Sequence, residues 1–381
     1  MPTPFELNPT LCFTLLGTFL IYLWTLPARS ARLAVLLLAL GLRAACIRWM
    51  GGLGTYHGVW WISWGAFLGI ASLIVLAVQV VGSRPPNRQS LVHTFYAGVV
   101  FPFCSLLIAY SIPITIRLWP KTYDPFLLAF DRGLGFQLNF ALGRFLLHSP
   151  TLLGLTTVVY YALPLAGCVL YASYRLRERQ PVAVLALFLS LMVVGYVQYG
   201  LFPAVGPVYA FPGWYPLHPP ALSQIAILPI AVPNAPRNCM PSLHLAAALV
   251  VWWNSRIWPR WGRLLTFLFL LATIFSTLAL GEHYLADLVV AVPFSLAFQA
   301  GWTTSVEFAS PARRRPLWWG AGLTVAWMVA LRYFFSAFLI SPVISWGLIL
   351  LTVVGCTVLE RNLSAAALDD DRKPVQAAVA G

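Results

Sequence analysis

Charged residues are scarce in this chain. They make up 9% of its 381 residues and only 11 are acidic, whereas 60% of the residues are hydrophobic. The mean hydropathy is +0.80. Soluble domains contain roughly 25% charged residues, so this deficit excludes an ordinary soluble globular protein. Apolar runs of about 20 residues, long enough to cross a bilayer, recur along almost the whole chain. The sequence therefore predicts an all-α, polytopic bundle of membrane helices.

Two other signals are missing. No positively charged segment precedes the first apolar run, since the first basic residue is Arg29. We therefore expect no cleavable signal peptide. The six cysteines are scattered without a C-x-x-C pair, which predicts neither a disulfide framework nor a metal site.

About eleven apolar runs are candidate membrane spans. They cover 10–27, 32–50, 59–82, 91–116, 150–174, 181–202, 240–258, 263–281, 283–305, 316–337 and 341–359. If these spans alternate in direction, 16 of the 24 basic residues fall on one side. The positive-inside rule makes that side cytoplasmic, with the N-terminus outside and the C-terminus inside. The net charge of +13 is thus explained by loop clusters, and we expect no nucleic-acid partner.

Three segments do not read as spans. Residues 117–149 mix apolar positions with charges, which favours an amphipathic helix in the membrane interface. Residues 203–238 are rich in proline and aromatic residues, which predicts an ordered loop, and long ordered loops are usually functional. The polar tail, 363–381, is expected to be disordered.

Two histidines stand at the ends of expected spans on the extracytoplasmic side. His244 opens the span at 240–258, and His283 opens the span at 283–305. Because two crossings return the chain to the same face, both should lie at the same depth. Asp287 follows His283 by four residues, which places both on one helical face. A carboxylate there can fix the imidazole tautomer, as in a catalytic triad. Ionisable groups at such positions are usually functional.

Arg237 precedes the turn at Pro241 and is a natural clamp for a phosphate, because guanidinium groups bind phosphate in a bidentate manner. An alternative is that Arg237 anchors the long loop to lipid phosphate. One anion clamp, two histidines and one orienting acid together favour phosphoryl transfer.

The motifs of this region resemble a known family. The sequence "PSLH", followed 39 residues after its histidine by "HYLAD", is similar to the second and third signatures of the type 2 phosphatidic acid phosphatase superfamily. "YDPFLLAFDRGLGF", "GLFPAVGPVYAFPGW" and "MPSLHLA" resemble motifs of the branch that contains inositol phosphorylceramide synthase. The resemblance covers roughly residues 90–305.

The resemblance implies a six-helix catalytic core within 91–305. N-terminal helices of unknown role would occupy 1–90, and C-terminal helices would occupy 306–362. It also implies that His283 attacks phosphorus, that Asp287 orients His283, and that His244 protonates the leaving oxygen. The expected partners are a lipid phosphate donor and a lipid or water acceptor, with no metal or other cofactor. The site would face away from the cytoplasm in a cell membrane.

The chain departs from the superfamily pattern at two phosphate clamps. The lysine that precedes an Arg-Pro pair in the first motif is absent, since Ala77 stands at its place before Arg84-Pro85. The arginine of the third motif is replaced by Thr277. Substitutes must therefore bind the phosphate, or activity is weak. The candidate substitutes are Arg237, Ser242, Lys121, Arg117, Arg132 and Arg144.

Other interpretations use the same residues. His244, His283 and Asp287 could ligate zinc, although no H-E-x-x-H pair is present. Asp124 and Asp131 could bind a headgroup or cap the amphipathic helix. A polyprenyl-phosphate glycosyltransferase would need an acid in an early extracytoplasmic loop, where Glu6 and the later Asp124 and Asp131 are candidates. A lipid transporter without catalysis would have a similar architecture.

Overall fold

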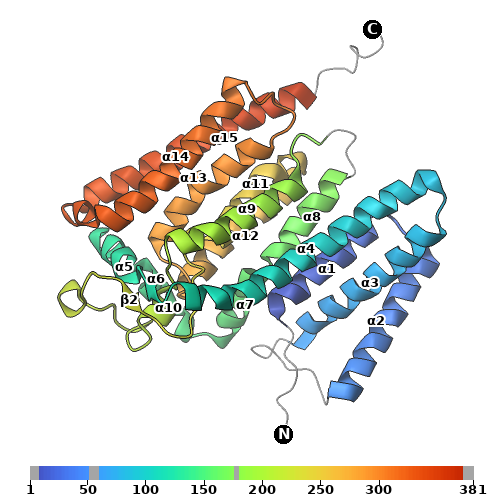
Figure 1. Ribbon diagram of the computed structural model, residues 1–381, viewed down its shortest axis with the longest axis horizontal. Coiled ribbons are helices and arrows are strands. Elements are labelled where there is room, and N and C mark those ends of the chain that lie inside the picture. The colour runs from blue at the N-terminus through green and yellow to red at the C-terminus, as the bar shows by residue number, and fades with distance from the viewer. Residues whose placement is uncertain (1–7, 51–59, 176–179, 372–381) are drawn as a thin grey trace. The chain divides into compact units, whose positions relative to one another are not determined.

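The chain is almost entirely helical over the residues that the computed structural model describes, which are 8–50, 60–175 and 180–371 (Figure 1). The strands in these ranges are β1 (Lys121–Thr122) and β2 (Ile230–Ala231), which pair antiparallel. The all-α prediction is confirmed.

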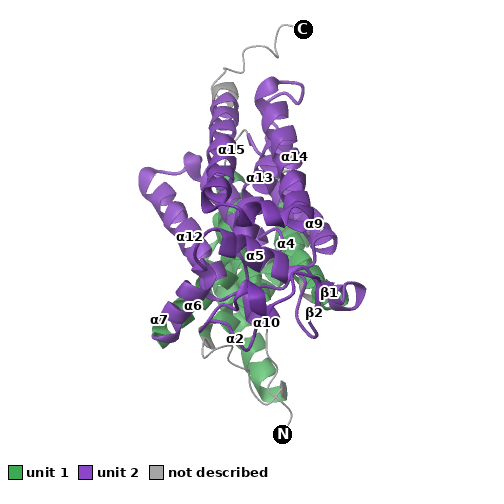
Figure 2. Cartoon of the chain, turned by 90° about the vertical axis from the view of Figure 1, so that its left-hand side faces the viewer, with its two compact units in different colours: residues 1–114, 149–176 green, residues 115–148, 177–381 purple. Residues whose placement is uncertain are grey.

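The chain forms two compact units, coloured separately in Figure 2. Unit 1 comprises residues 1–114 and 149–176, and unit 2 comprises 115–148 and 177–381. The helices of unit 1 are α1 (Pro9–Trp24), α2 (Arg29–Met50), η2 (Trp60–Ile62), α3 (Ser63–Gly82), most of α4 (Pro85–Leu118), α7 (Pro150–Tyr161) and α8 (Leu163–Arg175). Within this unit α1 packs against α3 and α8.

Unit 2 carries the motifs singled out above. After the end of α4 and β1 come α5 (Asp124–Gly133), α6 (Leu138–Leu147), α9 (Val184–Leu201), α10 (Pro207–Ala210), η3 (Leu222–Gln224), β2, α11 (Leu243–Asn254), η4 (Ser255–Ile257), α12 (Arg260–Ala279), α13 (Leu285–Trp302), α14 (Pro311–Tyr333), η5 (Phe335–Leu339) and α15 (Pro342–Asp371). Several of these helices begin at a serine whose hydroxyl accepts a backbone N–H, including Ser242 at α11 and Ser310 at α14.

Helix α13 is the centre of unit 2. It packs against α9, α11, α14 and α15, and it is the most buried of the candidate spans in the described residues. Asn254 of α11 and Gln299 of α13 exchange side-chain hydrogen bonds of 2.7 and 3.2 Å in this interior. Because unpaired amides in an apolar interior are costly, this pairing fixes the register of the two helices.

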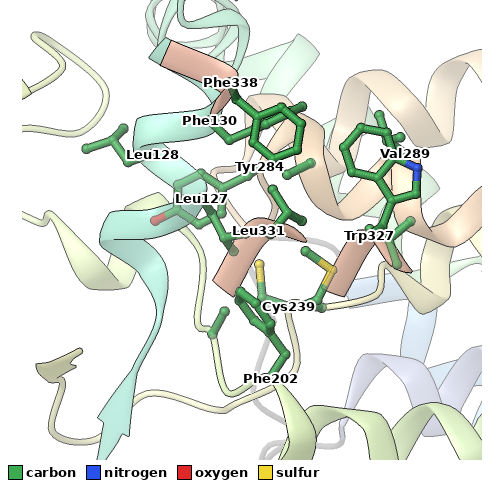
Figure 3. Close-up of a cluster of buried hydrophobic side chains, with 14 of the residues drawn as sticks. Leu127, Leu128, Phe130, Phe202, Cys239, Tyr284, Val289, Trp327, Leu331 and Phe338 are labelled. Atoms are coloured by element: carbon green, nitrogen blue, oxygen red, sulfur yellow. The ribbon is translucent and has the colours of Figure 1, made fainter. Parts of the chain in front are cut away.

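The segment 117–149 does not form the single interfacial amphipathic helix that the sequence predicts. It contains two short helices, and residues 124–131 of α5 are all buried. Apolar side chains on several faces of α5 explain the difference, because Leu127, Leu128 and Phe130 all enter the same core cluster (Figure 3). The ring of Phe130 lies 4.9 Å from that of Phe338 and 5.7 Å from that of Trp327. Helix α5 is therefore an internal element of unit 2.

All eleven ranges expected to span the membrane contain helix, but the count of eleven is not confirmed. Among the described residues, seven helices are long and apolar enough to cross a bilayer, or eight if the bent pair α7–α8 is one span. Helix α1 has 16 residues and α11 has 12, and α14 is not among the seven. These long apolar helices are those of an integral membrane protein. The direction in which they cross stays a prediction.

Part of the C-terminal tail is helical rather than disordered. Helix α15 continues to Asp371, because Leu363 and Ala367 lie one turn apart and are buried with Ala300 and Val306. The rest of the predicted tail, 372–381, lies outside the described residues.

Close contact between α13 and α14 at Gly320 gives a first test. A Cβ at Gly320 would lie 2.6 Å from the carbonyl oxygen of Pro293, whereas a Cβ at Gly322 would meet nothing within 4 Å. We expect Gly320→Val to force the helices apart and to lower the free energy of unfolding by about 1–3 kcal/mol, the usual cost of overpacking.

The measurement is the thermal unfolding midpoint of the purified protein in detergent. Gly322→Val is the matched control, since it adds the same side chain to the same helix. Equal midpoints for the two variants would contradict this packing.

Candidate active site

The two histidines from separate motifs meet in unit 2. His244 is the second residue of α11, and His283 lies two residues before α13. Their ring centroids are 6.0 Å apart, with an angle of 64° between the planes. His283 is buried, with 2% of its surface exposed, and His244 is half-buried. The two imidazoles are therefore neighbours in the fold.

Asp287 lies beside His283, as the four-residue spacing predicts. Its Oδ2 atom is 3.4 Å from Nδ1 of His283. The same oxygen accepts hydrogen bonds from the backbone N–H of Tyr284 at 2.7 Å and from the thiol of Cys239 at 2.6 Å. Asp287 is fully buried. Burial of the His283 ring disfavours its charged form, and the neutral imidazole is the form that can act as a nucleophile.

Asp131 accepts hydrogen bonds from the first residues of α13. Its two carboxylate oxygens accept the backbone N–H groups of Leu285 at 2.9 Å and Ala286 at 3.2 Å. Burial and the nearby Asp287 carboxylate raise the pKa of Asp131 to about 8. Asp131 therefore caps α13. It does not cap its own helix, which is one of the roles that the sequence suggests. Its contacts fix the backbone directly after His283.

Asp124 binds Tyr284, the residue that follows His283. Its Oδ1 atom accepts the hydroxyl of Tyr284 at 3.0 Å and the backbone N–H of Gly206 at 3.0 Å. Burial raises the pKa of Asp124 to about 6, and its hydrogen bonds oppose this shift. Since Asp124 and Asp131 are seven residues apart, they lie on one face of α5 and hold the His283 segment together.

The long loop, 203–238, is ordered and lies against the same segment. The backbone N–H of Val208 donates to the carbonyl of Gly281 at 3.1 Å. Gly206 adopts φ 91°, and a Cβ there would lie 2.4 Å from the carbonyl oxygen of Glu282. Only glycine fits this close approach in a left-handed conformation. The prediction of an ordered loop is confirmed.

Glu282 directly precedes His283 and is half-buried. Its carboxylate accepts the hydroxyl of Tyr209 at 2.9 Å. Burial raises the pKa of Glu282 to about 7, and the bond from Tyr209 opposes this shift.

Arg237 is turned towards the backbone. Its side chain donates to the carbonyl oxygens of Trp119 at 2.9 Å, Pro120 at 3.0 Å and Val232 at 2.8 Å, and also to that of Ala235. Four of the five guanidinium N–H groups are thus engaged, and the residue is only 1% exposed. These contacts hold the loop 203–238 to Trp119 and Pro120, directly after α4.

The other expected phosphate ligands have varied surroundings. The Ser242 hydroxyl accepts the N–H of Leu245 at 3.3 Å and so caps α11 beside His244. Lys121 is exposed in β1, and its ammonium makes no hydrogen bond or ion pair with the described residues. Arg132 donates to the carbonyls of Pro219 and Pro220, and Arg144 donates to that of Leu217. Arg117 is exposed near the end of α4.

Cys239 is a residue of this site that the sequence reasoning missed. Its partner, Asp287, is 48 residues away, and no local spacing links the two. The only sequence signal is its place in "RNCMPSLH", five residues before His244.

Cys239, His283 and Asp287 are also the set in the described residues that could hold a metal ion, with one ligand atom from each lying within 4.8 Å of the others. The Sγ–Oδ2 distance of 2.6 Å is shorter than the separation of about 3.5 Å expected for two ligands of one tetrahedral zinc ion. This distance fits a hydrogen bond better than a pair of metal ligands.

Comparison with known proteins adds one finding. No curated protein and no solved structure matches the chain at a significant level. Residues 125–301 match the family model described as the PAP2 superfamily, and this range contains His244, His283 and Asp287. This part of the chain is therefore similar to the PAP2 superfamily.

Proposed function

We propose that the chain is an integral membrane lipid phosphotransferase or phosphatase that acts through a phosphohistidine at His283. The proposal rests on the proximity of His244, His283 and Asp287, which come from two separate segments of unit 2. An imidazole that is buried beside a carboxylate and faces a second imidazole has the parts of a nucleophile, an orienting group and a proton donor.

In the first step, Nε2 of His283 attacks the phosphorus of the lipid phosphate. The bond between phosphorus and the leaving oxygen breaks as the nitrogen–phosphorus bond forms, and His244 in its protonated form gives its proton to that oxygen. Asp287 keeps the proton of His283 on Nδ1, so that the lone pair of Nε2 points to phosphorus.

In the second step, a hydroxyl oxygen of water or an alcohol attacks the phosphohistidine. His244, now neutral, accepts the hydroxyl proton as the nitrogen–phosphorus bond breaks. The two half-reactions restore both histidines. The acceptor determines whether the enzyme is a phosphatase or a transferase, and exclusion of water from the acceptor position favours transfer.

The donor class follows from the motifs that resemble the inositol phosphorylceramide synthase branch. We propose a phospholipid donor whose phosphoryl-containing headgroup is transferred at the extracytoplasmic face of a cell membrane. The missing first motif, with Ala77 in place of its lysine, fits a transferase better than an ordinary phosphatase. No metal is required by this chemistry.

The glycosyltransferase interpretation has less support. It needs an accessible acid in an early extracytoplasmic loop, and the candidates are Glu6, Asp124 and Asp131. Glu6 lies outside the described residues. Asp124 and Asp131 are buried and accept hydrogen bonds from the protein, with at least two donors each. Neither carboxylate is placed to contact a sugar acceptor.

The proposal predicts a covalent phosphoenzyme. Purified protein in lipid nanodiscs is incubated with phosphatidic acid, phosphatidylinositol or polyprenyl diphosphate, each labelled with ³²P, and is then quenched in alkali. We expect an acid-labile, alkali-stable label on His283, because phosphohistidine has this stability. The label should be absent from His283→Gln and unchanged by EDTA.

His244→Ala supplies the control for the proton donor. Loss of a general acid typically slows a step by about 10²–10⁴-fold when the leaving oxygen needs a proton. We expect this loss with phosphatidic acid and little loss with p-nitrophenyl phosphate, whose leaving group departs without protonation. Labelling that survives His283→Gln, or that is equally slow with both substrates in His244→Ala, would contradict the assigned roles.

Arg237 allows the anchoring and phosphate-binding roles to be separated. The guanidinium of Arg237 donates hydrogen bonds to four backbone carbonyls. We therefore expect Arg237→Lys to lower the thermal unfolding midpoint. The expected loss in the free energy of unfolding is about 3–5 kcal/mol, the cost of breaking a buried charged network. The measurements are the thermal midpoint and KM on the folded fraction. An unchanged midpoint with a large rise in KM would show instead that Arg237 binds the substrate phosphate.

A further inference from the structure

The thiol of Cys239 touches the chain on both sides of His283. Its Sγ atom lies 2.6 Å from Oδ2 of Asp287 and 3.3 Å from the carbonyl oxygen of Glu282. Cys239 itself is fully buried, and its backbone N–H is fixed by the carbonyl of Ala204 at 3.2 Å. A thiol has one proton, and the shorter distance assigns that proton to the carboxylate.

The two oxygens of Asp287 have unequal surroundings. Oδ2 accepts both the Cys239 thiol and the N–H of Tyr284, whereas Oδ1 is buried and accepts no hydrogen bond from the described residues. Nδ1 of His283 is likewise buried without a hydrogen-bond partner in the described part of the chain. Oδ2 of Asp287 lies 3.4 Å from this nitrogen, but it already accepts two donors. Buried polar atoms are rarely left unpaired, so an unpaired donor and an unpaired acceptor on adjacent side chains point to each other.

We propose that Cys239 is a positioning residue for the nucleophile: with the N–H of Tyr284 it occupies Oδ2 of Asp287 and leaves Oδ1 to accept the Nδ1–H of His283. This inference rests on the proposed function, because it assigns Cys239 a task in preparing His283 for attack. Cys239 itself touches no reacting atom.

Substitutions of Cys239 can separate hydrogen-bond donation from packing. A serine side chain is shorter and still carries a donor, whereas alanine and valine carry none. If the thiol acts as a donor, serine should preserve the arrangement and alanine should not. If the thiol acts only by filling space, valine should preserve it and serine should not.

The test reads the tautomer of His283 directly. Full-length protein labelled with ¹⁵N-histidine is reconstituted in liposomes, and solid-state NMR assigns the His283 signals by their absence in His283→Gln. We expect wild type and Cys239→Ser to hold His283 in the single tautomer that has its proton on Nδ1. In Cys239→Ala we expect both tautomers, and phosphohistidine formation from labelled phosphatidic acid slowed by about ten- to a hundredfold, the effect of one hydrogen bond to a charged group.

Cys356→Ala is the matched control, since Cys356 is a fully buried cysteine on α15 of the same unit. It should leave both the tautomer and the labelling rate unchanged. If Cys239→Ala does not fold, Cys239→Val takes its place as the variant without a donor.

A single Nδ1–H tautomer with an unchanged labelling rate in Cys239→Ala would overturn the proposal, and so would equal impairment of the serine and alanine variants. Failure of the proposed function gives a different result from failure of the Cys239 proposal. In that case wild type forms no phosphohistidine from any donor, while the tautomer comparison still decides the role of Cys239.

Discussion

The first turn of α13 is the constraint on which the rest of the site depends. The N-terminus of any helix leaves backbone N–H groups without partners, and here buried carboxylates supply those partners. Asp131 accepts the N–H groups of Leu285 and Ala286, and Asp287 reaches back to that of Tyr284. Because these bonds fix the chain directly after His283, the cap of α13 also sets the position of the imidazole. The geometry of the proposed nucleophile is thus a consequence of how one helix begins.

The sequence predicts the histidines and Asp287 but not the residues that hold them. His244 and His283 stand out because ionisable groups are rare in apolar spans, and Asp287 stands out because it lies one turn from His283. Cys239 and Asp131 carry no such signal, since their partners are 48 and more than 150 residues away. Periodicity describes one element at a time, whereas these contacts depend on how elements pack together. Residues 117–149 illustrate the same limit, because the burial of α5 depends on later helices.

The arrangement of the cations bears on how a phosphate is bound. Arg237, Arg132 and Arg144 all donate to backbone carbonyls, and the acceptors lie mostly in the loop 203–238. In this chain these arginines order the loop that lies against the His283 segment. A chain that lacks the two usual phosphate clamps must therefore stabilise the charge of the transition state with other groups. The remaining N–H of Arg237 and the exposed Lys121 and Arg117 are the cationic candidates that stay available.

The most direct test of His283 as the nucleophile is an experimental structure of the full-length protein with orthovanadate. Vanadate adopts the five-coordinate geometry of phosphoryl transfer and bonds to the attacking atom. We expect vanadium to be bonded to Nε2 of His283. His244 should lie within hydrogen-bonding distance of the vanadate oxygen opposite that nitrogen. Vanadate bonded to another side chain, or held away from both imidazoles in a protein that is otherwise folded as described, would contradict this assignment.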